Sequence, residues 1–129
     1  MSATETFSIT NTTKGKLPKL PFLAIKEACV GKAYTLSLVF IGSTRSRSLN
    51  KIHRGKDAPT NILSFELSKN SGEIFIDLPL SKKQSKKFER KEDNFLQFLF
   101  IHGLFHLKGM AHGDTMEKAE QKVRSKFKI

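Results

Sequence analysis

"DNFLQFLFIHGLFHL", residues 93–107, is the stretch that decides the fold, because it is almost wholly apolar for fifteen residues. A helix that is apolar on every side is surrounded by protein. The stretch therefore predicts a central helix against which the other elements pack. Gly109 follows it, and glycine readily adopts the left-handed conformation that ends a helix. We expect the chain to turn there.

Hydrophobic periodicity and turn residues predict the elements around this helix. Alternating or β-branched runs predict strands at 7–9, 33–42, 60–67 and 73–78, and helical spacing predicts helices at 22–30, 43–52, 81–93 and 114–127. The turn-rich segment SKNSG between the last two strands predicts a hairpin. Together these elements predict one small domain, residues 1–129, of the α+β (α/β) class, with a roughly four-stranded mixed sheet packed with about five helices.

The charge balance favours an anionic partner. Lys and Arg number 23 against 12 Asp and Glu, which gives a formal net charge of +11. Such an excess is typical of proteins that bind nucleic acid or an anionic surface. Six of the cations follow helical rows on about half of the predicted helix 81–93: Lys82, Lys83, Lys86, Lys87, Arg90 and Lys91. This face is either a solvated surface or a contact stripe for nucleic acid.

Cysteine usage and hydropathy indicate a cytoplasmic protein. Cys29 is the only cysteine, which excludes an intrachain disulfide and a thiolate metal cluster and fits a reducing compartment. The longest apolar-rich run, YTLSLVFI at 34–41, is far too short to cross a bilayer. The N-terminal residues lack the basic and apolar regions of a signal peptide. We therefore expect no membrane partner.

Three histidines lie in and just after the central stretch. His102 and His106 are four residues apart, so a helix projects them side by side from one face. A turn at Gly109 would let His112 return toward this pair, and a capping-box pattern at 114–117 predicts that a new helix starts there. Three converging imidazoles would bind Zn²⁺ or a similar divalent ion and leave one position open, which favours catalysis. The alternative is hydrogen-bonded core histidines.

The residue after the first histidine decides between two hydrolytic chemistries. The histidine spacing and the zincin-like central helix match the metzincin peptidases, but those carry a glutamate as general base where this chain has Gly103. Peptide hydrolysis is therefore disfavoured. An open metal site on a basic protein favours a phosphodiester substrate, and RNA hydrolysis is the resulting hypothesis. Arg54 and Lys56, in a loop shaped by Gly55 and Pro59, are the candidate cations for its phosphate.

Three segments together carry a family resemblance. They are HRGKDAPTNILSFEL (53–67), GEIFID (72–77) and HGLFHLKGMAH (102–112). In this order they resemble the YbeY family of bacterial endoribonucleases. The resemblance implies a small α/β metalloprotein that binds a zinc ion on three histidines and cleaves single-stranded RNA. It also implies a role in maturation of the 3′ end of 16S rRNA in the small ribosomal subunit and in ribosome quality control.

The resemblance assigns roles to particular residues. The family's zinc ligands fall on His102, His106 and His112, and its phosphate-binding arginine falls on Arg54, which precedes Gly-Lys-Asp here as in the family. Lys56 also matches and is a candidate substrate-binding residue. The expected partners are RNA and the small ribosomal subunit, and no DNA is expected.

The chain departs from the family pattern in two places. Met110 and Ala111 stand where the family usually has Tyr-Asp, so a carboxylate that would support the metal site is missing. Asp114 is the hypothetical replacement for it. His53 stands where the family more often has Tyr, and we interpret it as a surface histidine.

Two further readings stay open at this stage. The main alternative is an RNA-binding ribosome-assembly factor with a structural metal and no cleavage activity. A metallopeptidase is the weaker one. Three imidazoles would also accept Ni²⁺, Co²⁺ or Cu²⁺, so zinc rests on the family resemblance.

Overall fold

The structure, a computed structural model, describes residues 6–110 and 113–129. The element order is β1 (Phe7–Asn11), α1 (Phe22–Val30), β2 (Thr35–Ile41), α2 (Ser43–Arg54), β3 (Ile62–Ser68), β4 (Ser71–Asp77), α3 (Leu78–Lys87), α4 (Glu92–Leu107) and α5 (Asp114–Phe127). These four strands and five helices confirm the predicted α+β fold. Among the described residues, no helix is long and apolar enough to span a membrane.

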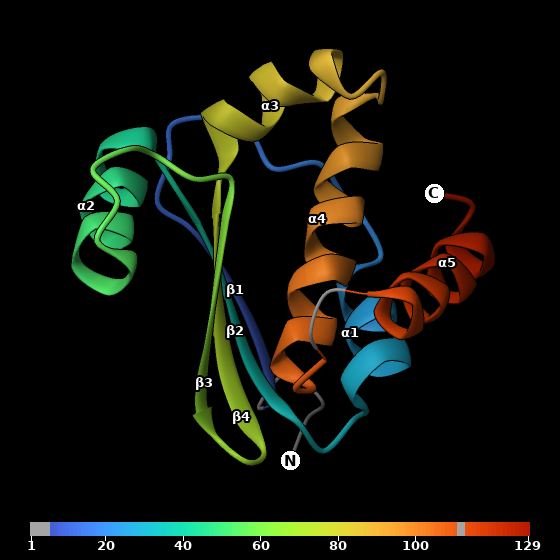
Figure 1. The fold of residues 1–129 in the computed structure, drawn as a ribbon. Coiled ribbons are helices and arrows are strands. Elements are labelled where there is room, and N and C mark those ends of the chain that lie inside the picture. The colour runs from blue at the N-terminus through green and yellow to red at the C-terminus, as the bar shows by residue number, and fades with distance from the viewer. Residues whose placement is uncertain (1–5, 111–112) are drawn as a thin grey trace.

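The four strands form one mixed sheet in the order β1-β2-β4-β3. β2 runs parallel to both β1 and β4, whereas β3 pairs antiparallel with β4, which confirms the predicted hairpin. β3 is therefore an edge strand, and in the part of the chain that the structure describes no strand lies beside its other edge. In Figure 1, α1, α4 and α5 lie on one side of the sheet and α2 lies on the other.

The larger part of the core lies between the sheet and α4. Helix α4 buries residues all round, as its apolar composition predicts. Phe100 on this helix meets the ring of Phe22 edge-on at a centroid distance of 5.4 Å. A smaller cluster of Ile41, Leu63 and Phe75 packs on the α2 side of the sheet. The sheet is thus covered on both faces, and α4 is fixed in the middle of the larger layer.

The predicted continuous helix over 81–93 is wrong. Helix α3 begins at Leu78, because the buried carboxylate of Asp77 accepts a hydrogen bond from the Leu80 backbone N–H at 2.9 Å and caps the first turn. It ends at Lys87, because Glu89 adopts a left-handed conformation with φ of 55°. The chain turns a corner there before α4 begins. The lysine rows of α3 therefore end at this corner.

Helix α5 begins at Asp114, as predicted, but without the predicted capping box. Gly113 occupies the N-cap, and this helix start has no side-chain capping hydrogen bond. One face of α5 packs inward, since Met116 and Val123 are buried and Phe127 packs against the core. The end of α4 also agrees with prediction. Gly109 has φ of 84°, and its N–H donates to the His106 carbonyl at 2.9 Å.

Candidate active site

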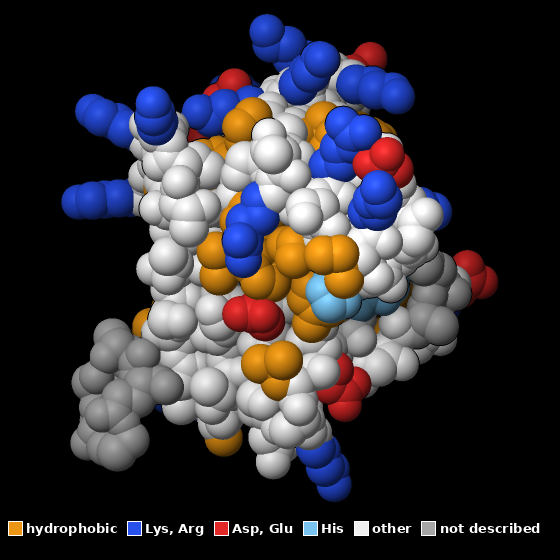
Figure 2. All heavy atoms as spheres, turned by 90° about the vertical axis from the view of Figure 1, so that its left-hand side faces the viewer, with side chains coloured by type: hydrophobic (Ala, Val, Ile, Leu, Met, Phe, Trp, Pro, Cys, Tyr) orange, Lys and Arg blue, Asp and Glu red, His pale blue; other side chains and the backbone are white. Residues whose placement is uncertain are grey.

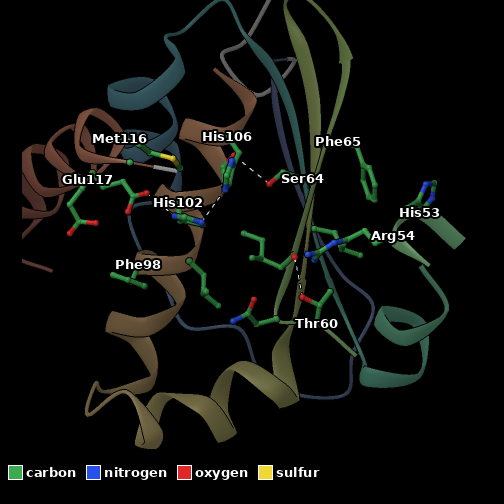
Figure 3. A pocket seen from close by; sticks show the side chains of 17 residues that line it. His53, Arg54, Thr60, Ser64, Phe65, Phe98, His102, His106, Met116 and Glu117 are labelled. Atoms are coloured by element: carbon green, nitrogen blue, oxygen red, sulfur yellow. Dashed lines mark hydrogen bonds and ion pairs between the residues drawn. The ribbon is translucent and has the colours of Figure 1, made fainter. Parts of the chain in front are cut away.

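A pocket of about 870 Å³ lies across the free edge of β3. Figure 3 shows His102 and His106 on one side of this strand and His53 and Arg54 on the other. The pocket thus brings together three of the predicted site residues, Arg54, His102 and His106, from segments about fifty residues apart. Lys56 is exposed and does not line it. His112 lies outside the described residues.

The two histidines have the geometry of paired metal ligands. Their Nε2 atoms are 3.1 Å apart, and the rings stand nearly perpendicular at 89°. Two nitrogens that each lie about 2.0–2.1 Å from a tetrahedral zinc ion are separated by roughly 3.3 Å. The pair therefore fits two corners of such a site. Within residues 6–110 and 113–129 no group of three or more His, Cys, Asp or Glu side chains is placed to hold a metal ion.

Glu120 on α5 supports this pair, and sequence reasoning missed it. Its Oε1 lies 2.7 Å from Nδ1 of His102, and Oε2 accepts a hydrogen bond from Arg124 at 3.2 Å. A carboxylate on the second ring nitrogen orients a ligating imidazole with Nε2 toward the metal. Glu120 lies one helical turn after the apolar Met116, so an acid four residues after an apolar residue on the predicted helix was the available signal. The hypothetical replacement, Asp114, is exposed.

Gly103 allows α4 to pack directly against the sheet. A Cβ atom at this position would lie 2.7 Å from Cδ1 of Ile62 and 2.8 Å from Oγ of Ser64. The Ser64 hydroxyl also donates a hydrogen bond to the Gly103 carbonyl at 3.3 Å. The glutamate that metzincin peptidases carry after the first histidine has no room here. The packing thus gives a physical reason for the departure noted in the sequence.

Arg54 is the last residue of α2, and a braced loop follows it. Gly55 ends the helix with φ of 70°. The buried Asn50 donates its side-chain N–H to the Ala58 carbonyl at 2.8 Å, which ties the loop back to α2. Arg47 donates to Asp57 at 2.7 Å, and this hydrogen bond lowers the pKa of the Asp57 carboxyl. Asp57 therefore serves loop structure, and the bracing fixes the end of α2 from which Arg54 reaches the pocket.

His53 lines the same pocket and packs on an aromatic neighbour. Its ring centroid lies 4.6 Å from that of Phe65 on β3, and Phe65 in turn meets Phe75 edge-on at 5.9 Å. The prediction of an exposed histidine is confirmed. The prediction did not foresee that His53 and Arg54 would face one pocket, because the contact depends on how α2 lies against β3.

Basic side chains gather on one side of the pocket. Figure 2 shows histidine and hydrophobic side chains exposed side by side on this face, with most of its Lys and Arg side chains above them. Such an arrangement attracts an extended polyanion toward the pocket.

A family model and several known proteins that are similar to this chain share one description. The family model described as Endoribonuclease YbeY matches residues 3–128. A relative described as Endoribonuclease YbeY from Neorickettsia sennetsu is 32% identical over 128 residues, covering 88% of this chain and 90% of the relative. Another with that description, from Aster yellows witches'-broom phytoplasma, is 35% identical over 100 residues, covering 70% of this chain and 65% of the relative.

The chain thus spans somewhat less than two thirds of the phytoplasma relative. The same holds for a relative from Geobacillus kaustophilus, of which 63% is covered. Among solved structures, the solution structure of a Thermotoga maritima protein is similar, with a TM-score of 0.65 and 22% identity over 95% of this chain and 91% of that one. This likeness supports the fold.

Proposed function

Because the chain belongs to the YbeY family, we propose that it is a metal-dependent endoribonuclease that cleaves single-stranded RNA. The observation that carries the proposal is that one pocket holds both the histidine pair and Arg54. A bound metal ion can polarise a phosphoryl oxygen and a nearby cation can hold the charge that develops there, so this combination suits phosphodiester cleavage. The net charge of +11 supports an RNA substrate.

His102 and His106 would hold the metal, with His112 as the third ligand by family resemblance. The proposed ion is zinc, and other divalent transition metals suit the same imidazoles. When bound, the ion would supply Lewis-acid polarisation of a phosphoryl oxygen. Glu120 would keep His102 in the tautomer that presents Nε2 to the metal, because its carboxylate, 2.7 Å from Nδ1, would accept a hydrogen bond from an Nδ1–H group.

Arg54 would bind a non-bridging oxygen of the scissile phosphate. Its planar guanidinium offers paired donors to the charge that develops there. Gly103 stands where a glutamate base would be. The nucleophile is either water or the 2′-hydroxyl of the RNA itself. Analysis of the product ends separates the two, since attack by the 2′-hydroxyl leaves a cyclic phosphate.

We assign the biological role from the family resemblance: maturation of the 16S rRNA 3′ end in the small ribosomal subunit and ribosome quality control, in the cytoplasm. The basic surface is consistent with rRNA as the partner. We also assign the preference for single-stranded RNA from the family resemblance.

The experiment is cleavage of labelled single-stranded RNA by purified protein, by the same protein after chelation, and after resupply of zinc. Duplex RNA and single-stranded DNA of the same sequence serve as substrate controls. We expect cleavage of single-stranded RNA alone, lost on chelation and restored by zinc. Activity that persists after chelation would contradict metal dependence.

One observation favours a second function, an RNA-binding ribosome-assembly factor with a structural metal. The exposed lysines of α3 lie outside the pocket, where they would bind RNA without cleaving it. Tight RNA binding with no cleavage in any metal state would support this alternative. Zinc-dependent digestion of casein would instead support a metallopeptidase.

A further inference from the structure

The corner between α3 and α4 presents an aromatic ring to solvent. Phe88 is 54% exposed, and a hollow of about 380 Å³ is lined by Phe88, Glu89, Arg90, Lys91 and Asn94. This hollow is separate from the pocket that holds the histidines. Isolated exposed hydrophobic residues are common on protein surfaces and need no explanation. This one differs because cations surround it and because its ring is held in place.

The corner is rigid at the backbone. The Glu89 N–H donates to the Lys86 carbonyl at 3.1 Å, and the Arg90 N–H donates to the Ser85 carbonyl at 2.8 Å. These two bonds are the Schellman pattern that closes a helix. Phe88 therefore leaves α3 in a fixed direction, and its ring stacks on the buried Phe95 at 5.3 Å with an interplanar angle of 18°. Phe95 thus covers part of the ring, and Phe88 is still 54% exposed.

The stacked rings continue toward the main pocket. Phe95 stacks on Phe98 at 6.0 Å and 13°, and Phe98 lines the pocket beside the histidines. Arg90 lines the hollow, and its guanidinium carbon lies 4.3 Å from the centre of the Phe98 ring. Arg90 therefore lies between the hollow and the part of the pocket that Phe98 lines. The two sites are therefore neighbours along one surface.

The charge around the hollow suits a polyanion. Arg90 and Lys91 line it, and Lys83, Lys86 and Lys87 are exposed on the adjoining helix. The acids nearby are Glu89, Glu92 and Asp93, so cations outnumber them. Proteins that bind single-stranded RNA combine such cations with an aromatic ring on which a base stacks.

We propose that this corner is a second RNA-binding subsite, which holds a nucleotide of the substrate strand outside the cleavage pocket. A base stacks on the exposed part of the Phe88 ring, and the flanking phosphates bind Lys91 and the lysines at the end of α3. The proposal rests on the proposed function, because it takes the same RNA strand as its ligand. Its consequence is that longer RNA binds more tightly than RNA that fills the pocket alone.

The chain has no tryptophan, so a Phe88→Trp variant carries a single fluorescent reporter at the proposed stack. We expect a single strand of roughly a dozen nucleotides to quench its fluorescence on binding, read by stopped flow before cleavage. Leu67→Trp is the matched control, because Leu67 is also exposed and lines neither the histidine pocket nor the hollow at Phe88. Quenching in the control alone, or in neither variant, would overturn the proposal.

A second measurement uses affinity. Phe88→Leu should weaken binding of the longer strand by roughly fivefold or more and leave binding of a trinucleotide unchanged, whereas Phe88→Tyr should match the unaltered protein. Equal affinities of Phe88→Leu and the unaltered protein for the longer strand would overturn the subsite and leave the proposed function standing. Failure of the unaltered protein to bind any RNA would overturn both.

Discussion

Removal of the Glu120 carboxylate should affect both folding and metal binding. The side chain is 5% exposed and connects His102 to Arg124. In Glu120→Ala the Arg124 guanidinium, which is also buried, loses its nearest carboxylate. Breaking a buried pair on one side costs about 3–5 kcal/mol. Arg124 retains the Glu117 carboxylate at 3.8 Å and the Phe98 ring at 5.2 Å, so we expect a loss of about 2–3 kcal/mol.

Comparison variants separate the two contacts of Glu120. Glu120→Gln keeps an oxygen that can accept a hydrogen bond from His102 Nδ1–H but removes the charge beside Arg124, so about 1–2 kcal/mol of stability should be lost. Glu117→Ala is the control, because this carboxylate is exposed and lies 3.8 Å from Arg124. Its cost should stay below about 1 kcal/mol. Urea unfolding of chelator-treated protein measures all three values.

Metal affinity is the second readout for the same variants. Loss of a carboxylate that orients a ligating histidine typically weakens metal binding by about 10–100-fold. We expect this for Glu120→Ala, with a smaller effect for Glu120→Gln and none for Glu117→Ala, measured by competition with a zinc chelator. A Glu120→Ala protein with unaltered stability and zinc affinity would refute the assigned role of Glu120.

Three other predictions concern the core. Gly103→Ala should lower the melting temperature, because the gain of up to about 1 kcal/mol in helix propensity is smaller than the cost of a Cβ placed 2.7 Å from Ile62; an equal or higher melting temperature would contradict this. Burial lowers the pKa of Lys26, so the unfolded state binds more protons between that lowered pKa and about 10.5, and stability should rise with pH across this window. Lys26→Met should be more stable at neutral pH and lose that rise in urea unfolding, and an unchanged pH profile would count against it. Burial raises the pKa of Cys29 to about 12, so a thiol reagent at pH 8 should label it only as the protein unfolds, whereas rapid labelling of the folded protein would show the opposite.

The fold was largely predictable because its signals are local. The apolar run at 93–107 and the turn between the hairpin strands depend on neighbouring residues only, and the structure places α4, β3 and β4 there. The corner after α3 was missed because Glu89 adopts a left-handed conformation without being glycine. Phe88, the residue before it, stacks on Phe95 of α4, and no local pattern reports such packing.

The candidate site was predictable only in part for the same reason. His102 and His106 follow from their spacing of four on one helix, and Arg54 follows from its loop motif. The contact of Glu120 with His102 spans 18 residues and depends on how α5 packs on α4. His53 faces the pocket because α2 lies against Phe65, which its sequence neighbours do not indicate. Local spacing and motifs were therefore enough to find His102, His106 and Arg54. The contacts of Glu120 and His53 could be found only from the packing of the helices.

The most direct test of the proposed active site is single-turnover cleavage of labelled single-stranded RNA, with zinc present, by the unaltered protein and by His106→Ala, Arg54→Ala and Lys56→Ala. Loss of a residue that binds the developing charge should slow cleavage by roughly a hundredfold or more. We predict such a loss for His106→Ala and Arg54→Ala, and only a small change for Lys56→Ala, which does not line the pocket. Near-normal cleavage by either His106→Ala or Arg54→Ala would contradict a shared active site across β3.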